Sequence, residues 1–168
     1  MKKALLIMSL LAVGMVVGVP QATAQEEITV TVTVPTLLSV TLDTDSWPIG
    51  DVTLGQTVTS DTIRATNNGN VAETFTIVSG NSVIDPGPPP VQGWTCGAPA
   101  GSETFAMEAQ GGDLSSYTSI CGTAQTLETP VAKDAFVDFT LRFTAPSATA
   151  YVDTQHTITV TVTASAST

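Results

Sequence analysis

The chain has 168 residues, of which 42% are hydrophobic and 12% charged, and its formal net charge is −10. This length is enough for one domain with its own hydrophobic core. An acidic chain is repelled by phosphate backbones and by anionic lipid surfaces, so the composition excludes nucleic acid as a partner.

The first 24 residues have the layout of a secretory signal peptide. Two lysines precede an apolar run that extends to Pro20, and Ala22 and Ala24 place small residues before Gln25. This order is typical of a cleaved leader, whereas a membrane anchor of the same length would be at the short limit for a span. We therefore expect residues 1–24 to be removed and residues 25–168 to form one exported domain, in the periplasm, on the surface or outside the cell, without a membrane span.

Alternation of apolar and polar residues dominates the mature chain. Residues 28–34 read Ile-Thr-Val-Thr-Val-Thr-Val, and residues 158–163 repeat the same pattern. Side chains of a strand point to alternate faces, so each segment predicts a strand with one apolar face and one threonine face. No part of the mature chain has a convincing apolar pattern at helical spacing, so we expect an all-β fold.

Further strands are expected between these two segments. They cover residues 37–42, 52–54, 57–66, 71–78, 104–108 and 136–143. The turn residues Asn67-Asn68-Gly69-Asn70 predict that residues 57–78 form a hairpin, because Asn and Gly tolerate positive φ. The proline-rich residues 85–90 and the glycine-containing residues 109–135 are expected to be irregular.

The strand over residues 136–143 indicates which of its faces is buried. Its odd positions, 137 to 143, are Val, Phe, Leu and Phe, and its even positions after Phe136 are polar. The odd face is therefore the predicted core face. The whole predicted core comprises Val30, Val32, Leu38, Val40, Leu42, Leu54, Ile63, Phe75, Ile77, Trp94, Phe105, Met107, Phe139, Leu141, Phe143, Ile158, Val160 and Val162.

Cys96 and Cys121 are the only cysteines of the chain. In an oxidising compartment a single disulfide is their default state. The alternative, a reactive or metal-binding pair, is disfavoured because the spacing is wide and His156 is the only histidine. On the chain-entropy model, closing a loop of about 25 residues would stabilise the fold by roughly 3.5 kcal/mol. The bridge would tie the predicted loop region to the segment around Trp94.

About eight or nine short strands separated by turns predict a two-sheet sandwich. Residues 63–77, with a strand, an Asn/Gly turn and a return strand carrying Phe75, resemble immunoglobulin-like domains of exported prokaryotic surface proteins. Residues 143–146 followed by residues 158–162 are similar to the closing strand pair of those domains. The resemblance implies an immunoglobulin-like sandwich with a surface, envelope or matrix role, and it transfers no site residue.

The sequence contains no recognisable catalytic constellation. It has no nucleophile-elbow motif, and His156 lies just before a strand, where we interpret it as a residue without a catalytic role. A glycosidase pair of carboxylates would need an aromatic-lined cleft, which the sequence does not indicate. We therefore predict that the protein is not an enzyme.

Two sets of residues are candidates for ligand binding. Trp47, Trp94 and Tyr117 could form a sugar-binding platform, although such residues more often pack in a core or at a sheet edge. A second set could hold calcium through oxygen ligands, although an Asp in a turn more often accepts backbone hydrogen bonds. This set comprises Asp43, Asp45 and Asp51. No other cofactor is expected.

The strands predicted at residues 28–34 and 158–163 lead to the main functional hypothesis. They lack the charges and bulges that guard exposed edges, so another strand should cover them. Pairing within one chain is the simpler arrangement, and addition of the N-terminal strand to a second copy is the other. We predict a secreted, non-enzymatic structural protein of the cell surface or extracellular matrix, either monomeric with these strands paired within one chain or associating with itself by strand addition. A carbohydrate- or calcium-binding module is the alternative.

Overall fold

The computed structural model describes residues 26, 28–85 and 88–167. The predicted signal peptide, residues 1–24, lies outside the described residues. The described residues before Val34 belong to one unit of the chain, and those from Val34 onward form a second, compact unit. The described residues contain strands and no helix, so the all-β prediction is confirmed. None of them forms a helix long and apolar enough to cross a membrane.

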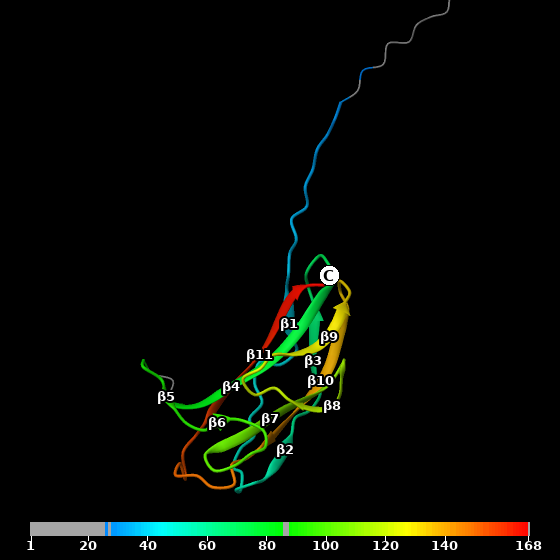
Figure 1. Ribbon diagram of the computed structural model, residues 1–168. Helices are drawn as coiled ribbons and strands as arrows, with labels where there is room; N and C mark the ends of the chain where they lie inside the picture. Colours follow the sequence, from blue (N-terminus) through cyan, green and yellow to red (C-terminus); the bar gives the residue numbers. More distant parts are fainter. Residues whose placement is uncertain (1–25, 27, 86–87, 168) are drawn as a thin grey trace, which may run out of the picture. The chain divides into compact units, whose positions relative to one another are not determined.

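Two β-sheets form the compact unit, which confirms the predicted two-sheet sandwich (Figure 1). The larger sheet has the order β1-β3-β10-β7-β6, with β2 beside β10 and β8 beside β7. Its strands are β1 (Val40–Leu42), β2 (Thr57–Thr59), β3 (Ile63–Asn67), β6 (Thr95–Cys96), β7 (Thr104–Gly111), β8 (Leu114–Ser119) and β10 (Phe136–Thr144). The smaller sheet has the order β11-β4-β5, with β9 also beside β4. Its strands are β4 (Glu73–Asp85), β5 (Val91–Gln92), β9 (Gln125–Val131) and β11 (Thr157–Ala166).

The core lies between the inward faces of the two sheets. Strand β10 buries its odd positions, Val137 to Phe143, and exposes half of Phe136, so the predicted register is confirmed. The partner strand β7 contributes Phe105 and Met107, and β4 contributes Phe75 and Ile77. Period-two alternation thus places one apolar face of each central strand inside. The burial of these apolar faces is the main driving force for this fold.

Residues 28–34 are not a strand, contrary to the sequence prediction. Their apolar side chains are exposed rather than buried: Ile28 by 90%, Val30 by 81%, Val32 by 82% and Val34 by 76%. The pairing of this segment with residues 158–163 stays a prediction. The alternating pattern predicted a segment able to form a strand, but strand formation also requires a neighbouring edge.

The turn at Asn67-Asn68-Gly69-Asn70 joins the two sheets and does not close a hairpin. Strand β3, which precedes it, pairs with β1 and β10, whereas β4, which follows it, pairs with β11, β9 and β5. The buried Asn67 side chain explains the crossing. Its Nδ2 donates hydrogen bonds to Val71 O (2.8 Å) and Val131 O (2.9 Å), and its Oδ1 accepts one from Gly69 N (2.8 Å).

The same turn holds the chain where it enters the compact unit. Asn70 Oδ1 accepts a hydrogen bond from Leu37 N (2.8 Å), and Asn70 Nδ2 donates one to Pro35 O (2.8 Å). The fully buried Glu73 accepts one from Ser39 N (2.8 Å). We call residues Asn67–Asn70 and Glu73 the entry clamp. A Cβ at Gly69 would collide with Glu73 Oε1 and Leu37 O, so the clamp requires glycine at this position.

Residues 109–135 are more ordered than predicted. They contain the end of β7, all of β8 and β9, and four fully or nearly fully buried side chains, Ala109, Ile120, Leu127 and Val131. Gly111 and Gly112 have φ of 141° and 55°, which allows the sharp reversal between β7 and β8. These apolar residues are widely spaced, so no alternating run was visible in the sequence.

Other predicted elements are shorter or absent. Residues 52–54 lie outside the strands, only residues 40–42 of the predicted strand 37–42 are a strand, and residues 57–66 are split between β2 and β3. Leu38, Leu42 and Leu54 are exposed and do not belong to the core, whereas Val40 packs against it. Part of the predicted proline-rich loop, residues 86–87, lies outside the described residues, and Pro88–Pro90 are exposed.

Replacing Asn67 with alanine is expected to lower the free energy of unfolding by about 3 kcal/mol, because a buried polar group that loses its partner costs roughly 1–3 kcal/mol. Denaturant unfolding followed by tryptophan fluorescence measures the change. The matched control is Asn68→Ala, since Asn68 is exposed and its side-chain amide donates its hydrogen bond to Thr41 Oγ1. Equal losses for the two variants would contradict the role given to Asn67.

Candidate functional site

A long groove lies between the two sheets along strand β11. One wall is the coil of residues 44–54, and the other is formed by residues 149–158 with Val160 and Val162. Core side chains form its floor, among them Met107, Phe139 and Phe143. We call this feature the inter-sheet groove. Its volume of about 1480 Å³ exceeds the ~300–1,000 Å³ of typical small-molecule pockets.

Strand β11 forms the edge of the smaller sheet beside this groove. It pairs with β4 from Thr157 to Ala166, and the described residues provide no ladder partner on its other side (Figure 1). Its threonines at positions 157, 159, 161 and 163 are exposed, whereas Ile158, Val160 and Val162 are half-buried and pack against the core. The predicted strand and its two faces are therefore confirmed, with the apolar face on the groove.

Unused backbone groups of β11 can be identified from its partner strand. Ser79, opposite Val160, donates its N–H to Ile120 O (2.7 Å) and accepts from Gly122 N (3.0 Å) on the side of β4 away from β11. Opposite residues of an antiparallel pair either exchange both hydrogen bonds or neither. The N–H and C=O of Val160 therefore point to the open edge.

Ile158 has the same backbone orientation as Val160. Its opposite residue, Ser82, donates its N–H to Trp94 O and accepts from Gly93 N, both at 2.9 Å, again away from β11. The apolar residues of β11 thus present both an inward side chain and outward-facing backbone groups. This arrangement is that of a strand able to accept one more neighbour.

An aromatic cluster closes one end of the groove. The rings of Trp94 and His156 stack with their centroids 3.6 Å apart, and Tyr151 meets His156 edge-on at 5.6 Å. Ser82 Oγ accepts a hydrogen bond from Trp94 N (2.6 Å) and is 2.9 Å from His156 Nδ1. Ser82 is fully buried, whereas His156 is half-buried and lines the inter-sheet groove.

His156, which we interpreted from the sequence as a strand-end residue without a catalytic role, is half-buried. Its parity matches that of Ile158 and Val160, which was the available signal that it points inward. The partners Ser82 and Trp94 are distant in the sequence, so the cluster itself could not be predicted. Burial lowers the pKa of His156 below its usual value, and the charge of Glu103 opposes this only in part.

The structure brings Trp47 and Trp94 to the inter-sheet groove but places Tyr117 elsewhere. Tyr117 lies on β8, where its ring packs under the Arg142 guanidinium at 4.0 Å and its hydroxyl bonds Thr140 Oγ1 (3.2 Å). One face of Trp94 is already stacked on His156, which leaves at most the other face for a sugar ring. The three predicted ligand-binding residues therefore do not share one surface.

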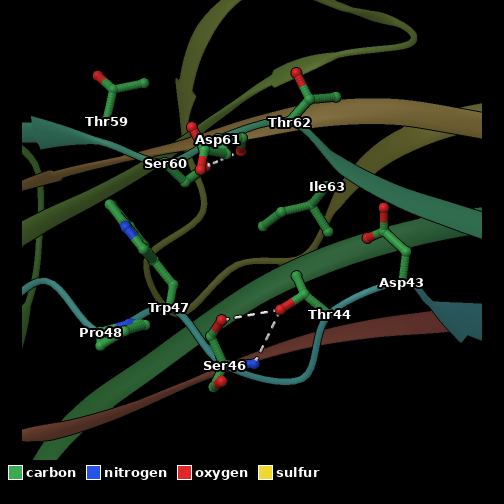
Figure 2. A pocket seen from close by; sticks show the side chains of 10 residues that line it. All are labelled: Asp43, Thr44, Ser46, Trp47, Pro48, Thr59, Ser60, Asp61, Thr62 and Ile63. Atoms are coloured by element: carbon green, nitrogen blue, oxygen red, sulfur yellow. Dashed lines mark hydrogen bonds between the residues drawn. The ribbon is translucent and has the colours of Figure 1, made fainter.

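Trp47 also borders a smaller pocket of about 430 Å³. Figure 2 shows this pocket between the coil that carries Trp47 and the chain from Thr59 to Ile63, which connects β2 to β3. Thr44 Oγ1 donates a hydrogen bond to Ser46 O (3.0 Å) and holds the coil in a tight turn. The polar groups that line this pocket are threonine and serine hydroxyls and the carboxylates of Asp43 and Asp61.

The three predicted metal ligands do not converge. Asp43 Oδ1 accepts a hydrogen bond from Arg64 N (2.9 Å), which ties the end of β1 to β3. Asp45 and Asp51 are exposed on the coil. Across the described residues, no three His, Cys, Asp or Glu side chains come close enough to hold a metal ion.

Cys96 and Cys121 form the predicted disulfide. Cys96 is the last residue of β6, and Cys121 follows β8. The backbone of Cys121 forms an isolated β-bridge with Ser79 of β4. The bond therefore joins β6 of the larger sheet to the segment after β8, and this segment contacts β4 of the smaller sheet through backbone hydrogen bonds to Ser79. A formed disulfide fits an oxidising location such as the cell envelope or the extracellular space.

Comparison of the chain with protein-family models, with curated proteins and with solved structures finds no match.

The buried His156 predicts a pH dependence of stability. Because its pKa is lowered on folding, the neutral ring stabilises the fold above the unfolded pKa of about 6.5, and this contribution is lost as the pH falls through the lower folded value. Melting temperatures measured from about pH 8 to about pH 5 should fall more steeply for the native chain than for His156→Phe, which keeps a ring against Trp94. Parallel curves for the two proteins would contradict this assignment.

Proposed function

We propose that this protein is an exported, non-enzymatic structural module that joins copies of itself by strand addition. One observation carries the proposal: residues 28–34 have the alternation of a strand, yet their four apolar side chains are 76–90% exposed. Exposed apolar surface of this kind is typical of an interaction site. The segment contains no charge and no bulge-forming residue that would keep it from pairing.

The composition supports the same proposal. The chain has few aromatic residues and a net charge of −10. Copies of it would therefore repel one another across a broad surface contact and would gain little from aromatic packing there. Main-chain hydrogen bonds between strands supply affinity without charge complementarity, and alternate side chains supply specificity. A strand contact therefore suits this chain better than contact between its acidic surfaces.

The predicted export route supports a location outside the cytoplasm. The leader would deliver the chain across a membrane and, on cleavage after Ala24, would leave residues 28–34 close to the new N-terminus. The disulfide between Cys96 and Cys121 is stable in such a compartment. We place the protein on the cell surface, in the envelope or in the extracellular matrix.

A carbohydrate-binding module is the second candidate, favoured by the presence of Trp47 and Trp94 in one groove. Calorimetry of the mature chain against soluble glycans tests it, and titration with calcium tests the related calcium-binding prediction. Saturable heat that disappears in the Trp47→Ala variant would support a sugar site. Heat that depends on calcium and disappears in Asp43→Asn would support a metal site.

Self-association should depend on the apolar face of residues 28–34. Light scattering on residues 25–168 over a concentration series should show mass rising well above that of one chain. The double variant Val30→Asp/Val32→Asp should stay at the mass of one chain, because charge on the inward face of an added strand would be buried without a partner.

The matched control is Thr29→Asp/Thr31→Asp, which adds the same charge to the other face of the same segment. This variant should still associate, since that face would remain in water. A constant mass of one chain for the native protein at every concentration would refute the proposal.

A further inference from the structure

Resting on the proposed function, we propose that the acceptor for residues 28–34 is the inter-sheet groove and the open edge of β11 in a second copy of this chain. The segment would extend the smaller sheet by one strand beyond β11. Its isoleucine and valines would enter the groove, and its threonines would face solvent.

The backbone of β11 carries the groups that such a strand needs. The N–H and C=O of Ile158 and Val160 point away from β4, toward the open edge, as the hydrogen bonds of Ser82 and Ser79 establish. A neighbouring strand would satisfy these groups in a continuous ladder.

The side chains of donor and acceptor alternate in the same way. Residues directly opposite in a sheet point to the same face, so a strand with Val30 and Val32 inward would continue the apolar face formed by Val160 and Val162. Its threonines would continue the exposed threonine stripe of β11. The extended sheet would then have one continuous apolar face toward the groove and one continuous threonine face toward solvent.

The dimensions also agree. Seven residues in a strand span about 23 Å, and the ten residues of β11 span about 33 Å. The groove exceeds the usual size of a small-molecule pocket and has core residues as its floor, so a chain segment with four apolar side chains is a better occupant than a compact ligand.

The charges of the groove do not oppose an uncharged donor. Its charged residues are carboxylates, Asp45, Asp51 and Asp153, and all three are exposed at its walls. A basic peptide would be drawn to these walls, but residues 28–34 carry no charge and would enter between them over the apolar floor. The chain itself thus contains the segment that fits.

Donor and acceptor are different parts of the molecule, so the contact is heterologous. Contacts of this kind form open chains unless the rotation between copies closes a ring. The donor ends at Pro35, whose carbonyl is bound by Asn70 of the entry clamp. Successive copies would therefore be joined without a slack linker.

Complementation between two full-length mature variants tests this assignment. The donor variant is Val30→Asp/Val32→Asp, which keeps an intact groove. The acceptor variant is Val160→Asp, which keeps an intact donor segment and places a charge in the groove. Thr161→Asp, on the exposed face of the same strand, is the control, and melting curves check that every variant folds.

Each variant alone should remain at the mass of one chain in light scattering, and an equimolar mixture should double that mass and grow no further. The donor segment of the acceptor variant fills the groove of the donor variant, and no second contact can form. Thr161→Asp should assemble like the native protein. Because Val160→Asp could perturb folding, Val160→Pro provides a second acceptor variant. It removes the N–H that faces the open edge without introducing a charge, and proline is tolerated on edge strands.

The outcomes separate the two proposals. If the native chain never exceeds the mass of one chain, the proposed function fails. If the native chain assembles and both folded acceptor variants assemble equally well, association is real but the groove is not its acceptor, and this inference fails alone. A mixture of two folded, monomeric variants that stays monomeric also overturns the inference.

Discussion

The buried side chain of Asn67 is the contact on which the two-sheet arrangement depends. It lies at the end of β3 and binds the backbone of Val71, just before β4, and of Val131, at the end of β9. Its own backbone N–H donates to Ala135 O (2.9 Å), and its C=O accepts from Asp134 N (3.0 Å), at the approach to β10. One residue therefore joins strands of both sheets at one end of the sandwich. A buried amide with partners for both of its polar atoms specifies this arrangement, because any other packing would leave those atoms unpaired.

The open side of the sandwich follows from the way the chain begins. After residues 35–39, which the entry clamp binds, β1 has only three residues, and the coil that follows runs beside the groove up to Leu54 without forming a strand. Trp47, Ile49 and Val52 pack against the core from this coil and partly fill the space between the sheets. Side-chain packing from a coil covers the core but leaves no backbone partner for β11. The groove and the free edge thus have a common origin.

The sequence predicted those features that depend on local pattern. The buried face of β10 and the two faces of β11 were correct because alternation decides which side chains share a face. The turn residues at Asn67–Asn70 were correctly placed, but local turn chemistry does not say which sheet the next strand joins. Residues 28–34 carried a strand pattern with no information on its partner. The stack of His156 on Trp94 links residues far apart in the chain, so only the inward parity of His156 could have been anticipated.

The entry clamp also determines how the fold would respond to tension. A pull on the chain before Pro35 would first act on the bonds that Asn70 makes to Pro35 and Leu37 and on the bond from Ser39 N to Glu73. These bonds lie next to the turn that joins the two sheets, so force would be shared between β3 and β4 and would not peel one short edge strand. At a separate place, the Cys96–Cys121 bond ties β6 to the segment after β8, which is hydrogen-bonded to Ser79 of β4. The domain is therefore fastened across its two layers by hydrogen bonds where force would enter, and at a second place by hydrogen bonds from a segment that the disulfide holds in position.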